Sequence, residues 1–330
     1  FFERAAEHDR EASFPFENFE DLRGAGLLNL SVPREFGGDG LGLLDAVQGV
    51  RAVASGDGST ALVLAMHLIH HGTLASDHGG WDPGLYERLC RESVGGIALV
   101  NTMRVEPDLG SPSRGGLPGT TGTRTGDGWR LNGHKLYSTG SPICAYHFVW
   151  ARTADDSPMT GHFVVPKDAP GLRTVATWDH LGMRATASND TIYEDVPLPL
   201  ENAADLRSPA GWMRPDVTAD AWNALCLGAL YTGIARSAAE WLKRYLHDRV
   251  PSNLGAPLSS LPRFQSSVGE IETMLYTSTR LIDALASDLD EGRYDASGDA
   301  RFGMAKYTAT TNAIRAVDLA VSLIGNPGLT

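Results

Sequence analysis

The sequence has few cysteines. Cys90, Cys144 and Cys226 are the only three among 330 residues, and no two of them have the close spacing of a metal or redox motif. Three thiols cannot all pair within one chain, and isolated thiols are typical of a reducing compartment, so we expect a cytoplasmic protein. We interpret the three side chains as small buried apolar groups.

Basic residues are outnumbered by acidic ones. The chain has 28 Lys and Arg against 40 Asp and Glu, which gives a formal net charge of 28 − 40 = −12. Nucleic acids and anionic membrane surfaces both attract basic faces, so this balance argues against either partner. The 42% hydrophobic and 21% charged content is typical of a folded globular protein rather than a disordered one.

Long apolar runs are also lacking. No segment reaches the roughly 18 apolar residues that a membrane-spanning helix needs, and no basic-then-apolar leader is visible after Phe1. The length of the chain exceeds what one hydrophobic core normally organises, so we expect two or three packed units.

Three patterns that suggest well-known sites are incomplete. His67, His70 and His71 have metal-like spacing, but no acidic or cysteine ligand follows them, so we expect no metal and only partial burial or solvent exposure. The glycine-rich segment 38–42 lacks the G-x-x-x-x-G-K-[ST] pattern of a phosphate loop, and no strand precedes it. The segment 56–59 does not match G-x-S-x-G. The sequence therefore argues against a metal site, a P-loop and a serine hydrolase.

The pattern of the chain changes twice, which predicts three domains. Residues 1–97 are expected to form an N-terminal helical domain, with apolar segments at 43–54 and 60–74 and with Ser59 as the N-cap of the second. Residues 98–208 are expected to form a β domain, because residues 95–140 hold 11 of the 37 glycines. Residues 209–330 return to a helical period.

The middle segment predicts antiparallel strands. Asn132-Gly133 suits a type I′ turn and predicts a hairpin between 129–131 and 134–137. Residues 146–153, 162–166 and 191–196 are rich in aromatic or β-branched residues and predict further strands. No helix-length segment separates them, which favours antiparallel pairing.

The last segment predicts three long amphipathic helices joined by short connections. Their apolar positions fall at 234–246, at 268–289 and at 304–324, the last group including Met304, Tyr307 and Ile314. Such helices suggest an up-and-down bundle that needs a fourth element or a partner chain. The expected fold is thus α+β and mainly α, with the order helices, β domain, helical bundle.

Five groups of residues, in the right order, resemble the acyl-CoA dehydrogenase superfamily. The first group resembles its N-terminal helical domain and comprises Phe14-Pro15, Gly26-Leu27, Val32-Pro33, Phe36-Gly37-Gly38 and Gly40-Leu41-Gly42. Glu106-Pro107 with Gly110-Ser111 resembles the first flavin motif, and residues 132–140 resemble the second. The stretches Leu181–Arg184 and Tyr193–Pro197 resemble the end of the β domain, and residues 249, 265 and 325–328 resemble flavin-contacting positions of the C-terminal bundle.

The resemblance implies a flavin site, with FAD as the expected cofactor and FMN as the alternative. In the first two motifs the implied cofactor-binding residues are Thr102, Val105, Gly110, Ser111, Tyr137, Ser138 and Thr139. Flavin sites of this family borrow residues from a neighbouring subunit, and the matching positions are Arg249, Gln265 and Asn326. The resemblance therefore implies a homodimer or homotetramer. It places Arg184 where we expect substrate contacts.

The residues of this flavin site have suitable chemistry. Gly110-Ser111 allows close approach of the backbone together with a hydroxyl donor for phosphate or ribityl oxygens. Tyr137 can cover the flavin ring, and Thr139 can donate toward the N5/O4 edge. The protein then orients the flavin, and the cofactor supplies the redox chemistry.

The family pattern breaks at the catalytic base. Dehydrogenases of this family keep a glutamate in one of two places, and the first of these is occupied by Asn223, or by Ala224 with a shift of one residue. Neither side chain can accept a proton as a general base. The second place lies past Thr330, so no catalytic residue is assigned. Val105 and Tyr137 also replace the family's Thr and Trp.

Three hypotheses follow for the function. The first is flavin-dependent α,β-desaturation of an acyl-CoA or another acyl thioester. The second is a monooxygenase that uses reduced flavin and dioxygen, because Tyr137-Ser138-Thr139-Gly140-Ser141 is more similar to the sulfur-compound monooxygenases of the superfamily, which need no carboxylate base. The third is a flavin- or ligand-binding helical protein without catalysis, since a fold does not fix a chemistry.

Overall fold

The computed structural model describes residues 1–330 except 110–115, 214–215, 326 and 328–330. The described chain falls into two compact units. The helical unit comprises Phe1–Ala5, Leu43–Ala65 and Val217–Thr330, and the sheet unit comprises Ala6–Gly42 and Met66–Asp216. The division into three domains at residues 97 and 208 stays a prediction.

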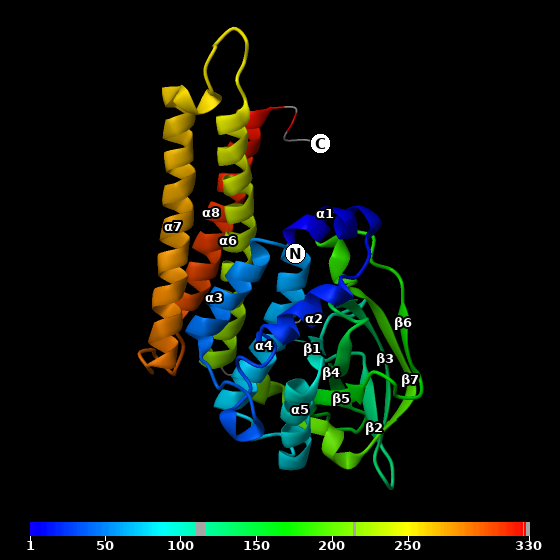
Figure 1. Cartoon of the computed structure of the whole chain (residues 1–330). Coiled ribbons are helices and arrows are strands. Elements are labelled where there is room, and N and C mark those ends of the chain that lie inside the picture. Colours follow the sequence, from blue (N-terminus) through cyan, green and yellow to red (C-terminus); the bar gives the residue numbers. More distant parts are fainter. Residues whose placement is uncertain (110–115, 214–215, 326, 328–330) are drawn as a thin grey trace. The chain divides into compact units, whose positions relative to one another are not determined.

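The helical unit is built on four long helices. They are α3 (Leu43–Ala54), α6 (Val217–Asp248), α7 (Pro262–Asp290) and α8 (Ala300–Ile324), and α6, α7 and α8 run side by side (Figure 1). The fourth element of the bundle is α3, which comes from the N-terminal part of the chain. Arg51 of α3 forms a bidentate ion pair with Asp283 of α7, with distances of 2.8 and 3.2 Å. Asp290 of α7 accepts from the backbone N–H groups of Leu43 and Leu44, and so caps α3.

The buried face of α8 differs from the expected one. Met304, Tyr307 and Ile314 are 63%, 72% and 62% exposed, whereas the helix buries a row of small residues and one aromatic. These buried residues are Phe302, Ala305, Ala309, Ala313, Ala316 and Ala320. Alanines allow close helix packing, so Met304, Tyr307 and Ile314 lie at the exposed edge of α8, whereas Val317 and Ile324 pack against the buried cluster. The apolar pattern of α7 is confirmed, since Ile271, Leu275, Ser278, Ile282 and Leu285 are buried.

The sheet unit contains one sheet of eight strands in the order β6-β7-β3-β2-β4-β5-β8, with β1 paired to β4. The strands are β1 (Leu99–Met103), β2 (Thr121–Arg124), β3 (Trp129–Ser138), β4 (Cys144–Thr153), β5 (Thr160–Pro166), β6 (Leu172–Val175), β7 (Asn189–Leu198) and β8 (Ala203–Arg207). Among the described strands, β1 and β2 pair parallel to β4, and the other pairs are antiparallel as expected.

The predicted hairpin at Asn132-Gly133 is wrong. Both residues lie inside β3, which runs without a turn through positions 129–138. The pairing of β3 with β7 shifts register between Leu131 and Gly133, and the Asn132 Oδ1 atom accepts from the Asp195 N–H. A Cβ at Gly133 would lie 2.3 Å from the Thr120 Oγ1 atom, so the glycine permits close approach of a neighbouring side chain rather than a turn.

Two hydrophobic clusters stabilise the sheet unit. One joins the helices to the sheet and includes Leu74, Leu85 and Leu89 with Tyr146 and Phe148. The second cluster is formed by strand residues such as Trp129, Leu131, Phe163 and Tyr193.

The remaining helices of the chain are α1 (Phe2–Glu11), α2 (Phe16–Gly24), α4 (Gly58–Ser76) and α5 (Pro83–Gly95), together with the short helices Arg34–Phe36, Arg184–Thr186, Leu200–Asn202, Pro209–Met213 and Leu258–Ser260.

The cap of α4 also differs from the prediction. The Asp57 carboxylate, not the Ser59 side chain, accepts from the Ser59 and Thr60 N–H groups at 3.2 and 2.9 Å.

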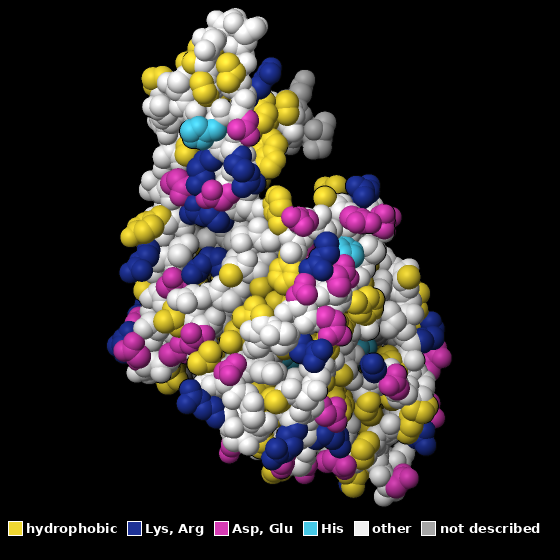
Figure 2. Space-filling view, viewed as in Figure 1, with side chains coloured by type: hydrophobic (Ala, Val, Ile, Leu, Met, Phe, Trp, Pro, Cys, Tyr) yellow, Lys and Arg dark blue, Asp and Glu magenta, His cyan; other side chains and the backbone are white. Residues whose placement is uncertain are grey.

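No helix in the described part of the chain is both long and apolar enough to cross a membrane. On the face shown in Figure 2, basic and acidic side chains are interspersed.

Candidate functional site

The first flavin motif is fixed by backbone contacts. The Thr102 N–H donates to the His70 Nε2 atom at 3.0 Å, and the Asn101 Nδ2 group donates to the Thr139 carbonyl at 2.9 Å. The Leu136 N–H donates to the Val105 carbonyl at 2.9 Å. The contacts made by Asn101 and Val105 bring the first motif against the end of β3, where the second motif lies.

His67, His70 and His71 take part in this support, and they are more buried than expected. His67 and His71 are 1% and 2% exposed, and His70 is half-buried. Burial lowers the pKa of His67 and of His70 to about 4, so both rings are neutral near pH 7. The His67 Nδ1 atom accepts from the Val100 N–H, and its Nε2 group donates to the Leu28 carbonyl. These rings hold the backbone of β1. Within the described residues no group of three or more His, Cys, Asp or Glu could hold a metal ion.

A buried ion pair connects the two motifs. Lys135 is fully buried, and its Nζ group donates to the Glu106 carboxylate at 2.5 Å and to the Trp150 carbonyl at 2.6 Å. Glu106 also accepts from the Gly119 N–H at 2.6 Å and from the Thr120 hydroxyl at 2.5 Å. Burial opposes the charge of Glu106, but the hydrogen bonds from Lys135 and Thr120 outweigh it and hold the carboxyl pKa below its ordinary value. Burial lowers the pKa of Lys135 to about 8.

The second motif ends in strained backbone. Tyr137 has φ of 54°, and two further non-glycine residues near the start of β7, Met183 and Ala187, have φ of 55° and 42°. Left-handed conformations of such residues cost roughly 1–3 kcal/mol each and cluster at ligand sites. The Gly140 N–H donates to the Thr186 carbonyl, and the Ser141 hydroxyl donates to the Ala187 carbonyl, so the strained segments support one another.

The side chains of this motif fit a flavin. Tyr137 is 51% exposed, and the stacked rings of Trp178 and His180, 3.8 Å apart, lie edge-on to it at 6.1 and 5.9 Å. These aromatic rings can contact a planar tricyclic ring. The Thr139 Oγ1 atom is 2.9 Å from the Ser188 hydroxyl, and the buried Ser138 hydroxyl is 2.8 Å from that of Thr191. Trp178 and His180 escaped the sequence analysis because neither belongs to a recognised motif.

Arg184 holds the segment that carries Trp178 and His180. Its guanidinium donates to the Asp9 carbonyl at 2.7 Å, to the His180 carbonyl at 2.9 Å and to the Asp179 carboxylate at 3.3 Å. These contacts show a structural use of Arg184, and its substrate-binding role stays a prediction.

The C-terminal candidates belong to the helical unit. Arg249 directly follows α6 and lines a groove with Trp241, Arg244, Tyr245 and Asp248. The Trp241 and Tyr245 rings stack there at 5.3 Å. Gln265, in the first turn of α7, donates to the Ser259 carbonyl at 2.9 Å. An arginine beside aromatic rings suits a phosphate with an attached base, so these residues also fit part of a flavin dinucleotide.

Some sequence candidates lie outside the described residues, namely Gly110, Ser111 and Asn326. Of the others, Thr102, Val105, Tyr137, Ser138, Thr139 and Arg184 belong to the sheet unit, and Arg249 and Gln265 to the helical unit. At the first base position, Asn223 of α6 is exposed and its Oδ1 atom accepts from the Lys306 Nζ group at 3.5 Å, whereas Ala224 is buried.

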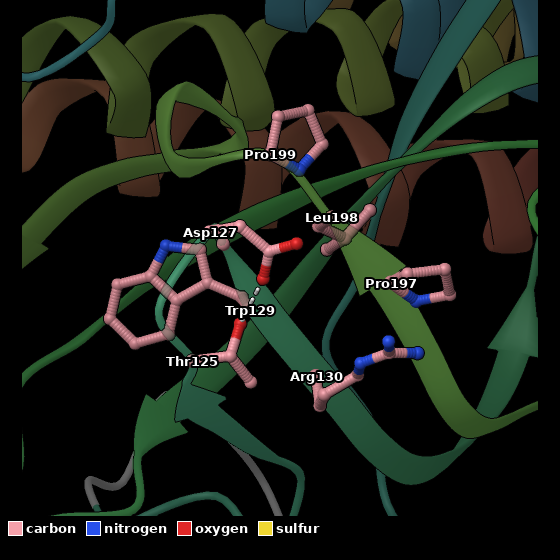
Figure 3. Close-up of a pocket in the computed structure, with 8 residues that line it drawn as sticks. Thr125, Asp127, Trp129, Arg130, Pro197, Leu198 and Pro199 are labelled. Atoms are coloured by element: carbon pink, nitrogen blue, oxygen red, sulfur yellow. Dashed lines mark hydrogen bonds between the residues drawn. The ribbon is translucent and has the colours of Figure 1, made fainter.

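A pocket of the sheet unit lies at the end of β3 away from Tyr137 (Figure 3). Thr125, Asp127, Trp129 and Arg130 line it together with Pro197–Pro199, and the Thr125 hydroxyl donates to Asp127 at 3.1 Å. Trp129 and Tyr137 are eight residues apart on one strand, which corresponds to roughly 26 Å. This pocket is therefore separate from the aromatic rings around Tyr137.

The cysteines are buried free thiols, as expected. Burial raises the pKa of Cys90 to about 11 and that of Cys144 to about 12, so neither is a thiolate at neutral pH.

Three family models match successive parts of the chain. The acyl-CoA dehydrogenase N-terminal domain matches residues 2–79, the middle domain matches 102–196 and the C-terminal domain matches 217–330. These matches follow the order of the motifs described above.

Individual relatives include two chemistries. The chain is 31% identical to the putative acyl-CoA dehydrogenase YdbM of Bacillus subtilis, over 100% of this chain and 84% of that protein. It is 30% identical to L-evernosamine nitrososynthase of a Micromonospora species, over 97% and 76% of the two chains.

Solved structures agree with these relatives. KijD3 in complex with FMN and a dTDP-linked 3-amino sugar superposes with a TM-score of 0.85 at 29% identity, over 99% of this chain and 81% of that one. Butyryl-CoA dehydrogenase of Megasphaera elsdenii gives 0.87 at 20% identity, over 100% and 85%, which shows the shared fold. The chain therefore belongs to the acyl-CoA dehydrogenase superfamily, whose members are flavin-dependent oxidoreductases with FAD or FMN as cofactor.

Proposed function

We propose that this chain is a flavin-dependent monooxygenase, which uses reduced flavin and dioxygen to oxidise a small-molecule substrate. The observation that carries the proposal is the pair of residues at the first base position. Asn223 and Ala224 have no proton-accepting carboxylate, and the Asn223 amide is occupied by Lys306. Desaturation of a thioester needs a base to remove the α-proton, whereas oxygenation does not.

Relatives support this reading. The nitrososynthases at 30–31% identity are named for the oxidation of amino sugars, and KijD3 has been solved with FMN and an amino sugar nucleotide. The sequence Tyr137-Ser138-Thr139-Gly140-Ser141 also resembles the monooxygenase branch. An amino group is therefore one candidate site of oxidation on the substrate.

In this proposal the chain binds and orients the cofactor. Tyr137, with Trp178 and His180, contacts the flavin ring, and the Thr139 hydroxyl donates to its polar edge. Thr102 and Val105 belong to the same proposed site, and the backbone contacts described above fix their positions. Bound reduced flavin would supply the electrons that activate dioxygen.

The remaining site residues belong to the assembly. We infer that Arg249 and Gln265, with Asn326, bind the phosphate end of the flavin of a neighbouring subunit, which requires a homodimer or homotetramer. Gly110-Ser111 binds phosphate or ribityl oxygens, and Arg184 lies near the substrate. The scattered buried thiols favour a cytoplasmic location.

A second candidate is desaturation of an acyl thioester. The putative acyl-CoA dehydrogenase at 31% identity and cyclohex-1-ene-1-carbonyl-CoA dehydrogenase of Geobacter metallireducens at 30% favour it. In this case the base would come from the second family position, which follows residue 330.

Two measurements on the flavin-loaded protein separate the candidates. Under anaerobic conditions a panel of acyl-CoA thioesters should leave the flavin absorbance unchanged, and reduced flavin mixed with oxygen and an amine substrate panel should give an oxygenated product. Isotopically labelled dioxygen identifies the origin of the new oxygen atom. Bleaching of the flavin by an acyl thioester, with formation of the enoyl product, would replace the monooxygenase by the dehydrogenase. A purified protein that neither contains nor binds flavin would leave only the ligand-binding hypothesis.

A further inference from the structure

Arg104 lies between two residues of the proposed flavin site, Thr102 and Val105. It follows β1, which pairs parallel to β4 with Met103 opposite Val149, so Arg104 lies level with Trp150. The Arg104 Cζ atom is 4.8 Å from the centre of the Trp150 ring. A guanidinium in cation–π contact with a ring can still donate its N–H groups to an anion.

The charge of Arg104 is not neutralised within the described part of the chain, where it forms no ion pair. Glu106 and Asp205 each bind another cation instead. Glu106 pairs with Lys135, and Asp205 binds Arg207 through two bonds of 2.6 and 2.7 Å. In a chain of net charge −12, a guanidinium without a carboxylate is a local site of positive potential.

The neighbouring rings add no negative charge and leave a polar atom unsatisfied. The His162 ring is 5.2 Å from Trp150 and 5.8 Å from Trp212, and its Nδ1 atom is buried without a hydrogen-bond partner. Burial, with Arg104 and His70 nearby, holds the pKa of His162 well below its ordinary value, so the ring is neutral. Arg207 covers the Trp212 ring at 4.6 Å. A buried polar atom without a partner suggests a ligand or a water.

We propose that Arg104, which lies over the Trp150 ring beside His162, binds an anionic group of the substrate, a carboxylate or a phosphate. This inference rests on the proposed function, because it gives the flavin site a substrate with a negative charge. The planar fork of Arg104 can form two charge-assisted hydrogen bonds to either oxyanion. The anion would thereby be held next to the residues that line the flavin site.

Binding can be measured without catalysis. The full chain, loaded with flavin, is titrated at constant ionic strength with sodium benzoate and, separately, with sodium pyrophosphate, and the tryptophan fluorescence is followed. We expect saturable quenching by one probe, which identifies the anion as carboxylate or phosphate, and we expect Trp150→Phe to remove most of the signal.

Variants test the role of Arg104. Loss of a charged hydrogen bond costs about 1.5–3 kcal/mol, so Arg104→Gln should weaken binding of the probe roughly 10- to 100-fold, and Arg104→Lys should weaken it less. Arg173→Gln is the matched control, because Arg173 is an exposed arginine of the same unit that pairs with Glu194 at 3.2 Å. Equal affinities of the Arg104→Gln and Arg173→Gln proteins, or no saturable binding of either probe to the parent chain, would overturn the proposal. Anion binding is measured without turnover, so either of these results would refute anion binding by Arg104 without deciding between oxygenation and desaturation. The proposed function is tested by its own experiment.

Discussion

At the scale of single residues, buried charge and buried histidine support the proposed flavin site. Lys135 and Glu106 connect the first flavin motif to the second through one ion pair and several hydrogen bonds. His67 and His70 accept backbone N–H groups of β1 through neutral rings. Both groups hold the backbone of the two motifs in place.

Removing one partner of the buried ion pair should destabilise the protein strongly. Lys135→Met leaves the Glu106 carboxylate buried without its cation, which typically costs 3–5 kcal/mol. The free energy of unfolding from urea titration checks this value. Arg173→Met, which breaks an exposed pair with Glu194, should change it by less than about 1 kcal/mol. A similar decrease in the free energy of unfolding of the two variants would show that the buried ion pair stabilises the protein no more than the exposed one.

The buried histidines should make stability depend on acid pH. The His67 pKa is lowered from 6.5 to about 4 in the folded chain. The contribution of neutral His67 to the free energy of unfolding is therefore complete above pH 6.5. It is lost as the pH falls from 6.5 toward 4, because over this range the unfolded chain binds a proton that the folded chain does not bind. The shift corresponds to about 3 kcal/mol. His67→Gln keeps an acceptor and a donor without this titration. Its free energy of unfolding should therefore fall less steeply than that of the parent between pH 6.5 and 4, and parallel curves for the two proteins would contradict the argument.

At the scale of elements, small residues determine how closely the helices of the bundle pack. Gly233 of α6 faces α3, where an added Cβ would lie 2.4 Å from the Arg51 carbonyl oxygen and 2.6 Å from the Ala54 Cβ atom. Alanines provide much of the buried face of α8 and part of that of α6. The large apolar residues at the edges of these helices, such as Tyr307, are left exposed.

Two glycine substitutions in this bundle should have opposite effects. Gly233→Ala inserts a methyl group against the α3 backbone and should cost about 1–3 kcal/mol, because the packed helices cannot yield without strain. Gly303→Ala places the same group in open space on α8 and should stabilise the protein by about 0.5–1 kcal/mol through helix propensity. Thermal unfolding of both variants is the measurement. A Gly233→Ala protein as stable as the Gly303→Ala protein would disprove the close packing of α3 and α6.

At the scale of the whole molecule, the resemblance implies that a second subunit completes the proposed flavin site. Tyr137 and Thr139 belong to the sheet unit, whereas Arg249 and Gln265 belong to the helical unit. The resemblance assigns the second pair to the flavin of a neighbour. Flavin binding and self-association should therefore depend on one another.

This dependence can be tested with Arg249. We expect the parent protein to run as a dimer or tetramer with about one flavin per chain, measured by light scattering and absorbance. Arg249→Gln should weaken flavin binding roughly 10- to 100-fold through loss of a charged hydrogen bond. Arg280→Gln, an exposed residue of α7, is the control and should bind flavin as the parent does. A flavin-loaded monomer would refute the shared site.

Periodicity and composition predicted the order of the elements, because burial of apolar side chains imposes a local spacing that can be read along the chain. The strands 146–153, 162–166 and 191–196 lie within β4, β5 and β7, and the apolar positions of α7 are buried as expected. The prediction of a hairpin turn at Asn132-Gly133 was wrong because the conformation of these residues depends on Thr120 and Asp195, which are distant in the sequence. The predicted burial of Met304, Tyr307 and Ile314 of α8 was wrong, because close packing favoured alanine over larger side chains, whereas Val317 and Ile324 pack against the buried cluster.

The sequence by itself determined the family, the order of the elements and the absence of a carboxylate at positions 223 and 224. Motif identity and hydrophobic spacing are local properties, so no coordinates were needed for them. Only the tertiary structure decided that Glu106 pairs with Lys135, that Trp178 and His180 stand beside Tyr137, and that Arg104 lies on Trp150 without a carboxylate. These relations join residues of separate strands and loops, and their energies depend on burial and distance, which arise only when the chain has folded.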